Sequence, residues 1–105
     1  MSDSEDLWEN ITRVKQGKPC LSMTIKKDTF EMDGFQPVLA YNRINYHMES
    51  LDEYWDVLYI YEDPQMKEII EATPHIPKTK YDHWVLGCLF GYSHEAIMKF
   101  IEEEN

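Results

Sequence analysis

The sequence predicts an α+β fold, formed by a single small, helix-rich globular domain over residues 1–105. A length of 105 residues suits one modest hydrophobic core. The content of 43% hydrophobic and 13% aromatic residues is typical of a packed chain and not of a disordered one. In part of the N-terminal half every second residue is apolar, as in a strand, and further along apolar residues recur every three or four positions, as in a helix. We therefore expect a small antiparallel sheet from the N-terminal half and a helical hairpin at the C-terminus.

The first predicted element is a helix near the N-terminus. Ser2 and Glu5 have the spacing of a capping box at its start. One helical face then carries four apolar side chains: Leu7, Trp8, Ile11 and Val14. The triplet Gly17-Lys18-Pro19 should end this helix, because Gly and Pro both interrupt helical structure.

The segment after this helix predicts strands. Leu21, Met23 and Ile25 alternate with smaller or polar residues, as in a half-buried strand. Residues 29–32 are expected to pair with a neighbouring strand, and Asp33-Gly34 is a turn signal after them. These elements should supply most of the sheet.

Two segments in the middle of the chain are ambiguous. Residues 38–48 fit either a strand or a helix opened by Pro37, and a strand is favoured at their start. Ser50 and Glu53 form a second capping box, which predicts a helix over residues 51–62. Five apolar side chains follow at helical spacing: Leu51, Tyr54, Trp55, Leu58 and Tyr61. The run "VLYIY" within this segment also has high strand propensity.

The C-terminal part predicts three helices. Asp63-Pro64 should open a short helix that ends near Ala72 and buries Met66, Ile69 and Ile70. A loop with two prolines follows. Residues 81–91 are apolar almost all round, which predicts the central buried helix of the domain.

Two glycines and one serine define the expected hairpin. Gly87 should allow close contact with a neighbouring backbone, and Cys88 beside it should be buried. Gly91 suits a left-handed helix C-cap, and Ser93 suits the N-cap of the last helix. The inner face of that last helix should hold four side chains: Ala96, Ile97, Phe100 and Ile101.

The charge balance excludes some functions. Twenty acidic and ten basic residues give a formal net charge of -10, which repels phosphate backbones and anionic membrane surfaces. We therefore expect no direct nucleic-acid binding and no membrane partner. The acidic N-terminus does not resemble a signal peptide and no apolar run approaches ~20 residues, so a cytoplasmic location with reduced cysteines is expected.

No pattern in the sequence predicts catalysis, a metal or a cofactor. His83 and Cys88 are five residues apart and His94 lies six further on, which matches none of the usual zinc spacings. The four glycines are isolated, so a glycine-rich phosphate loop is absent. The chain is therefore expected to be non-enzymatic, without catalytic or metal-binding residues.

The leading hypothesis is a protein-interaction module that acts as an inhibitor or regulator through an acidic face. Six carboxylates would lie along or beside the helix predicted for residues 51–62: Glu49, Asp52, Glu53, Asp56, Glu62 and Asp63. Their spacing of about 4 Å on such a helix approaches the ~3.4 Å phosphate spacing of one DNA strand. The partner would have a basic surface, and a nucleic-acid-binding protein is one candidate. If these acids are solvated, changing three of them to Lys should leave stability unchanged.

The alternative hypothesis is a module that binds or sequesters a nucleotide or metabolite. Seven Tyr and three Trp are many for this length, and pockets use such side chains for stacking and hydrogen bonding. The expected pocket residues are Tyr41, Tyr46, Trp84 and Tyr92. The sequence leaves a homo-oligomer open under either hypothesis.

The combination of small size, acidity and aromatic content resembles the broad group of phage-encoded and mobile-element inhibitors, which includes DNA mimics. The resemblance is one of composition. It implies an inhibitor, and it assigns no role to any particular residue.

Overall fold

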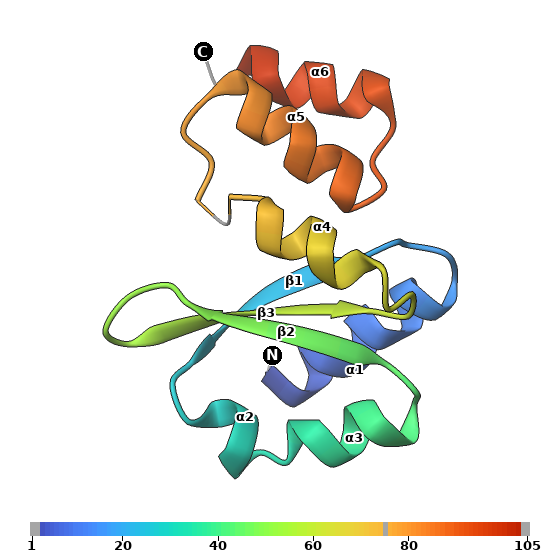
Figure 1. Ribbon diagram of the computed structural model, residues 1–105, viewed down its shortest axis with the longest axis vertical. Helices are drawn as coiled ribbons and strands as arrows, with labels where there is room; N and C mark the ends of the chain where they lie inside the picture. Colours follow the sequence, from blue (N-terminus) through green and yellow to red (C-terminus); the bar gives the residue numbers. More distant parts are fainter. Residues whose placement is uncertain (1–2, 75, 104–105) are drawn as a thin grey trace.

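The protein has a layered α+β arrangement, seen in a computed structural model that describes residues 3–74 and 76–103 (Figure 1). A three-stranded sheet has α1, α2 and α3 on one side and α4, α5 and α6 on the other (Figure 1). The bounds are α1 Asp3–Lys15, β1 Leu21–Lys26, α2 Thr29–Met32, α3 Phe35–Tyr41, β2 Asn45–Ser50, β3 Trp55–Tyr61, α4 Met66–Ala72, α5 Lys80–Leu89 and α6 His94–Glu103. The predicted α+β class, antiparallel sheet and C-terminal helical hairpin are confirmed.

The sheet is antiparallel throughout and has the strand order β1-β3-β2. Ile60 of the central strand lies opposite Leu21 of β1 and Tyr46 of β2. All five side chains from Val57 to Tyr61 are buried, because both faces of β3 are covered. A continuous run of β-branched and aromatic residues is what such a doubly buried strand requires.

The larger core lies between the sheet and the three N-terminal helices. On α1, Leu7, Ile11 and Val14 are almost fully buried, and their spacing of three and four residues places them on one face. They pack with side chains of the other elements on this side of the sheet: Leu21, Ile25, Phe30, Phe35, Leu39, Ile44, Leu58 and Ile60. The predicted helix is confirmed, although Trp8 is half exposed and the capping residue Ser2 lies outside the described residues.

A second, smaller core attaches the C-terminal helices to the other face of the sheet. Ile70 of α4 and Leu89 of α5 pack with four buried side chains: Cys20, Val57, Tyr59 and Tyr61. The prediction that Asp63 caps α4 is wrong: α4 begins at Met66 with Gln65 at its N-cap position, and the Asp63 carboxylate instead accepts the backbone N–H of Gln65 at 2.9 Å in the turn before the helix. Of the expected buried side of α4, Ile70 is buried and Ile69 is half exposed.

The α5–α6 turn has the predicted caps. Gly91 adopts a φ of 76°, the left-handed conformation that glycine tolerates best. Ser93 then caps α6, because its Oγ accepts the backbone N–H of Ala96 at 3.1 Å. A Cβ added at Gly91 would lie 2.7 Å from Cδ of Pro19, so the turn packs tightly against the loop that precedes β1.

The prediction of a helix over residues 51–62 is wrong. Residues 51–54 form the turn of a β-hairpin, and β3 follows it. A helix at this place could bury one face only, whereas the run Val57–Tyr61 is buried on both faces as the central strand. The Ser50 and Glu53 pattern that resembles a capping box lies in the hairpin connection.

Two further expectations for the first half are also wrong. Residues 29–32 form the short helix α2 and not a strand, and Phe30 is buried from it. The favoured strand at the start of residues 38–48 is helix α3, which buries Phe35 and Leu39 one turn apart. The strand occupies only the later part of that segment, as β2. Asp33-Gly34 is a turn as predicted, and it joins α2 to α3.

The predicted helix over residues 81–91 is present as α5, which ends at Leu89, but this helix is not the buried centre of the domain. Within α5 only Leu89 is fully buried, Tyr81 is 71% exposed and Cys88 is exposed. The sheet and α4 already form the layers beneath, so α5 and α6 make the outer layer (Figure 1). On α6, Ile97 and Ile101 are buried, whereas Ala96 and Phe100 are exposed.

Gly87 is a point of close approach between α5 and α6. A Cβ added there would lie 2.5 Å from Cγ1 and 2.9 Å from Cδ1 of Ile97, so the close neighbour is a side chain and not the expected backbone. We expect Gly87→Leu to destabilise the protein by about 1–3 kcal/mol through overpacking. Urea denaturation measures this change in the free energy of unfolding.

The same clash supplies a control for the Gly87 prediction. Removing the Ile97 side chain beyond Cβ should create the missing space, so Gly87→Leu should cost less in an Ile97→Ala background than in the wild type. Equal costs in both backgrounds would contradict the contact between Gly87 and Ile97.

Candidate functional site

The six carboxylates of the predicted acidic face do not form one helical stripe. Glu49 is in β2, Asp52 and Glu53 are in the hairpin turn, and Asp56 is near the start of β3. Glu62 and Asp63 follow the other end of β3. Because most of an extended strand separates the two groups, they lie roughly 17–20 Å apart. The helix-based spacing argument for DNA mimicry therefore no longer applies.

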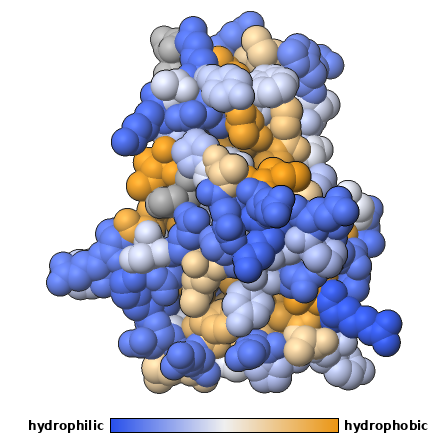
Figure 2. All heavy atoms as spheres, in the orientation of Figure 1, coloured by the Kyte–Doolittle hydropathy of each residue, from blue (hydrophilic) through white to orange (hydrophobic). Residues whose placement is uncertain are grey.

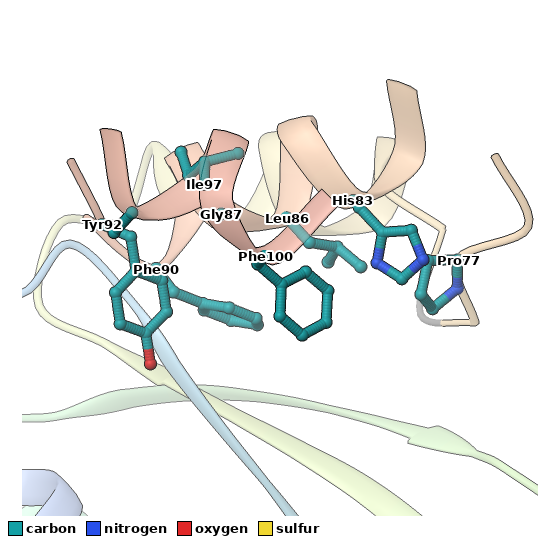
Figure 3. A pocket seen from close by; sticks show the side chains of 9 residues that line it. Pro77, His83, Leu86, Gly87, Phe90, Tyr92, Ile97 and Phe100 are labelled. Atoms are coloured by element: carbon teal, nitrogen blue, oxygen red, sulfur yellow. The ribbon is translucent and has the colours of Figure 1, made fainter. Parts of the chain in front are cut away.

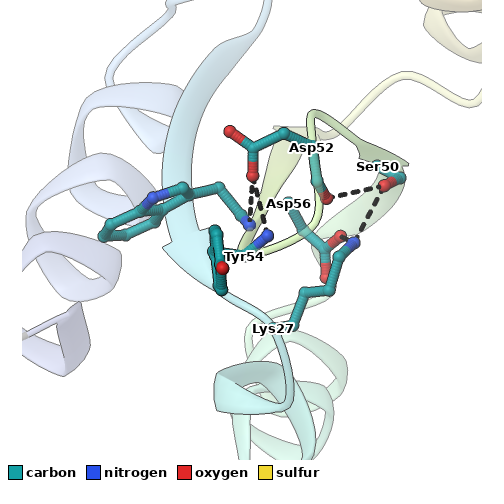
Figure 4. Close-up of polar contacts among 6 residues, drawn as sticks. Lys27, Ser50, Asp52, Tyr54 and Asp56 are labelled. Atoms are coloured by element: carbon teal, nitrogen blue, oxygen red, sulfur yellow. Dashed lines mark hydrogen bonds and ion pairs between the residues drawn. The ribbon is translucent and has the colours of Figure 1, made fainter.

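Asp52 has a structural role in the hairpin turn (Figure 4). Its Oδ1 accepts the backbone N–H groups of Tyr54 and Trp55 at 2.8 and 2.9 Å. The Ser50 hydroxyl donates to the Asp52 carbonyl oxygen at 3.3 Å. This arrangement satisfies main-chain donors that the turn would otherwise leave without partners.

Asp56 is the acceptor of a partly buried ion pair at this end of the sheet. Lys27 Nζ donates to Asp56 Oδ1 at 2.7 Å and to the Ser50 hydroxyl at 2.8 Å (Figure 4). The Asp56 side chain is 17% exposed, so less solvent screens this pair than a surface pair. Lys27 thereby ties the end of β1 to both strands of the hairpin.

Three of the other carboxylates also have partners, and one does not. Glu62 pairs with Lys15 of α1 at 3.0 Å, and Asp63 accepts the backbone N–H of Gln65 in the turn before α4. Glu49 Oε1 lies 3.1 Å from His47 Nε2 on the same face of β2. Among the described residues, no hydrogen bond or ion pair holds the exposed Glu53 side chain. A role for these acids in partner contact stays a prediction, but most of them contribute to the fold.

The four aromatic residues of the predicted pocket do not meet. Tyr46 packs on Phe30 with ring centroids 4.8 Å apart, on the side of the sheet that α2 covers, and Tyr41 of α3 is 87% exposed. Trp84 of α5 stacks on Tyr81, with centroids 6.4 Å apart, on the opposite side of the sheet. Of the four, Tyr92 alone borders the hollow described next, and Lys18 Nζ lies 4.5 Å from its ring centroid.

An apolar groove of about 450 Å³ lies on the C-terminal hairpin. Phe90, Tyr92 and Phe100 project to the same side of the hairpin, whereas Ile97 points the other way (Figure 3). We call this hollow the α5–α6 groove; its residues are Pro77, His83, Leu86, Gly87, Phe90, Tyr92, Ala96, Ile97 and Phe100. The His83 imidazole and the Tyr92 hydroxyl are polar groups at its border. The His83 and Phe100 rings have centroids 5.3 Å apart.

Apolar side chains around the groove remain accessible to solvent. Phe100 is 48% exposed and Tyr92 is 55% exposed, and Trp84 on the same hairpin is 40% exposed. Figure 2 shows orange apolar surface interrupting the polar surface over the half of the molecule where α4, α5 and α6 lie. Accessible aromatic side chains gathered at one hollow are typical of a binding surface.

Two buried groups among the described residues, Cys20 and Tyr59, have raised pKa values. Burial raises the pKa of the Cys20 thiol to about 12, which keeps it protonated and unreactive. Burial, with the Glu49 carboxylate and Cys20 adding to the effect, raises the pKa of Tyr59 to about 12. No three His, Cys, Asp or Glu residues in the described part of the chain are grouped to hold a metal ion. Cys88 is exposed and free, which corrects the expectation that it is buried.

Comparison with known proteins leaves the geometry as the basis for function. No protein-family model, no curated protein and no solved structure matches the chain. Among the described residues, no helix is both long enough and apolar enough to cross a bilayer.

Sequence reasoning misses the α5–α6 groove because it places Leu86, Phe90 and Phe100 in a core. The signal that could have found it is the number of apolar residues between residues 81 and 101, which exceeds what one buried face of a two-helix hairpin holds. One hairpin face can pack on the preceding layer, so the remaining apolar side chains must face solvent or a partner.

The hydrogen bonds of Asp52 and Asp56 change the expected result of reversing the acidic residues. Glu53→Lys should alter the free energy of unfolding by no more than about 0.5 kcal/mol. Asp52→Lys should cost about 1 kcal/mol or more, because two backbone N–H groups lose their acceptor. Asp56→Lys should cost about 1–3 kcal/mol, because it places a second ammonium beside Lys27.

Chemical denaturation of the three single variants tests this order. Equal stability of all three would show that Asp52 and Asp56 are solvated surface residues, as the sequence alone suggests. Asp56→Asn is the matched control: it keeps the shape of the side chain and removes the charge, so it should cost less than Asp56→Lys.

Proposed function

We propose that the protein is a non-enzymatic interaction module that binds a segment of a partner protein in the α5–α6 groove. The observation that carries this proposal is the groove of about 450 Å³ with half-exposed aromatic side chains at its border. The partner segment is amphipathic and basic. As in the sequence-based hypothesis, the protein would act as an inhibitor or regulator of the partner that carries this segment.

The groove supports the apolar half of this proposal. Phe90, Phe100 and Leu86 present apolar surface to one side, and a bound apolar side chain would remove it from water (Figure 3). Aromatic side chains in pockets supply most of the binding energy in many protein interfaces. A helix with apolar residues at spacings of three and four suits a groove between two helices.

The charge distribution supports the basic half. Between residues 62 and 103 there are eight Asp or Glu and four Lys, and the whole chain carries a formal charge of -10. On α6, Glu103 lies one helical turn beyond Phe100. Such a surface attracts a basic partner and raises its association rate at low salt. The acidic residues near the β2–β3 turn contribute to this attraction, although they do not form a continuous stripe.

The test is a capture experiment with matched variants. Phe100→Ala removes an aromatic side chain from the groove, whereas Tyr41→Ala removes one that is 87% exposed on α3, beyond the sheet. From lysate of the native host, wild type and Tyr41→Ala should retain a common protein that Phe100→Ala loses. Loss of one interface anchor corresponds to about 2 kcal/mol, or ~30-fold in affinity.

The salt dependence supplies a second readout of the same experiment. Retention should fall as the salt concentration rises, because the attraction between opposite charges is screened. Equal retention by Phe100→Ala and Tyr41→Ala would contradict binding in the α5–α6 groove. Retention that does not depend on salt would contradict the basic character of the partner. Both alanine variants must first show the wild-type melting temperature within a few degrees.

The groove also supports a second candidate function, which is the binding of a small apolar or aromatic ligand. Its volume falls within the range of about 300–1,000 Å³ that small-molecule sites occupy. The His83 imidazole and the Tyr92 hydroxyl are the polar groups that could orient such a ligand. This site differs from the predicted one, because Tyr41, Tyr46 and Trp84 do not line it.

Thermal shift measurements against a panel of nucleotides and aromatic metabolites separate the two candidates. A ligand at 100 times its dissociation constant stabilises the folded state by about 2.7 kcal/mol. A true ligand of the groove should raise the melting temperature of wild type and Tyr41→Ala but not of Phe100→Ala. No shift across the panel would count against this function and leave the protein partner as the better explanation.

A further inference from the structure

Strand β2 forms an edge of the sheet that lacks the lysine, proline and bulge by which many edges are protected. The strand order places β1 and β2 at the two edges. Lys26 ends β1 and Lys27 follows it, and lysines at an edge discourage pairing with another strand. β2 has the sequence Asn-Tyr-His-Met-Glu-Ser, which contains neither Lys nor Pro, and it pairs with β3 over all six residues without a bulge.

The hairpin register shows which backbone groups of β2 point away from the sheet. The N–H of Leu51 donates to the carbonyl oxygen of Trp55 at 3.0 Å, at the position that continues the β2–β3 register. Residues of an antiparallel strand bond alternately to one side and the other. The N–H and C=O groups of Tyr46, Met48 and Ser50 therefore point to the open edge. In Figure 1, β2 is the nearest strand, and no other element crosses in front of it.

We propose that β2 pairs with β2 of a second copy of the chain, antiparallel and centred on Met48. In this register Met48 lies opposite Met48 of the second copy, and Tyr46 lies opposite its Ser50. Each of the three residues directs its N–H and C=O toward the second copy, which gives about six main-chain hydrogen bonds across the junction. The two three-stranded sheets then form one continuous sheet.

The side chains of β2 complement each other in this register. His47 lies opposite Glu49 of the second copy, at a position where antiparallel side chains approach closely. The two residues are already compatible neighbours, since their side chains are 3.1 Å apart within one chain. Centring on Tyr46 would pair only residues 45–47 of each strand, whereas centring on Met48 pairs residues 46–50. Among registers centred on a residue whose backbone points outward, the Met48 register therefore pairs the most residues and gives the best charge match.

The other face of β2 adds apolar contact to the junction. The side chains of Tyr46 and Met48 are 38% and 37% exposed, and both lie on the face that α2 and α3 cover. Pairing would place the two Met48 side chains against each other. Strand addition buries less surface than the roughly 1,200–2,000 Å² of a standard interface, so the dimer should be weak and concentration-dependent. The α5–α6 groove lies on other elements, so this proposal does not depend on the proposed function.

A charge exchange across the junction tests the register. In a His47→Glu dimer, the new carboxylate faces Glu49 of the second copy, and the two-fold symmetry makes this contact occur twice. In a Glu49→Lys dimer, the new ammonium faces His47 of the second copy, also twice. Each variant alone should dimerise less than the wild type. Mixed together they should form a heterodimer, because the carboxylate introduced in one chain then faces the ammonium introduced in the other. Sedimentation at protein concentrations up to about 0.5 mM, in about 0.3 M NaCl to screen the negative charge of both copies, measures this.

A cysteine placed on the two-fold axis provides an independent readout. Met48→Cys in a Cys88→Ser background should form a covalent dimer under mild oxidation, because opposed Cα atoms about 5.5 Å apart suit a disulfide. Thr24→Cys on the β1 edge, in the same background, is the matched control and should cross-link much more slowly. A wild type that stays monomeric at about 0.5 mM, a mixture that forms no heterodimer, or equal cross-linking of the two cysteine variants would each overturn the proposal.

Discussion

The burial of β3 on both faces is the constraint on which the rest of the structure depends. Five consecutive side chains, Val57 to Tyr61, must leave water, and their alternation sends Leu58 and Ile60 to one side and the other three to the opposite side. Two separate sets of helices are therefore needed to cover one short strand. The N-terminal helices supply the larger core, and α4 with the C-terminal hairpin supplies the smaller one.

This double burial also explains which elements the sequence predicts and which it does not. Amphipathic α1, the alternating β1 and the cap of α6 depend on local patterns, and these predictions are confirmed. The run Val57–Tyr61 has no such pattern, because a strand buried on two faces has no polar side. Ser50 and Glu53 imitate a helix cap there, and the predicted acidic face depends on that helix. Tertiary pairing with β1 and β2 outweighs the apparent cap.

The candidate site is predictable only in part for the same reason. Tyr92 belongs to both the predicted pocket and the α5–α6 groove, and the apolar residues of the hairpin are recognisable as buried surface. The sequence does not predict whether a helix packs directly on the sheet or on another helix. Phe90 and Phe100 have the composition of a core, and the presence of α4 beneath the hairpin leaves Phe100 partly in water. Acid side chains behave in the converse way, since Asp52 and Asp63 look like surface charge and serve as main-chain acceptors.

The order of strands in the sheet has a consequence for how the chain folds. β2 and β3 are joined by a turn of four residues, so their hairpin closes a short loop. β1 pairs with the same central strand across a separation of 39 residues from Leu21 to Ile60, which is a slower loop to close. During synthesis the N-terminal third can form α1, but its apolar face has no complete sheet to cover until residue 61 has left the ribosome. Strand β3, the last strand to be synthesised, therefore completes the hydrophobic core on which α1 packs.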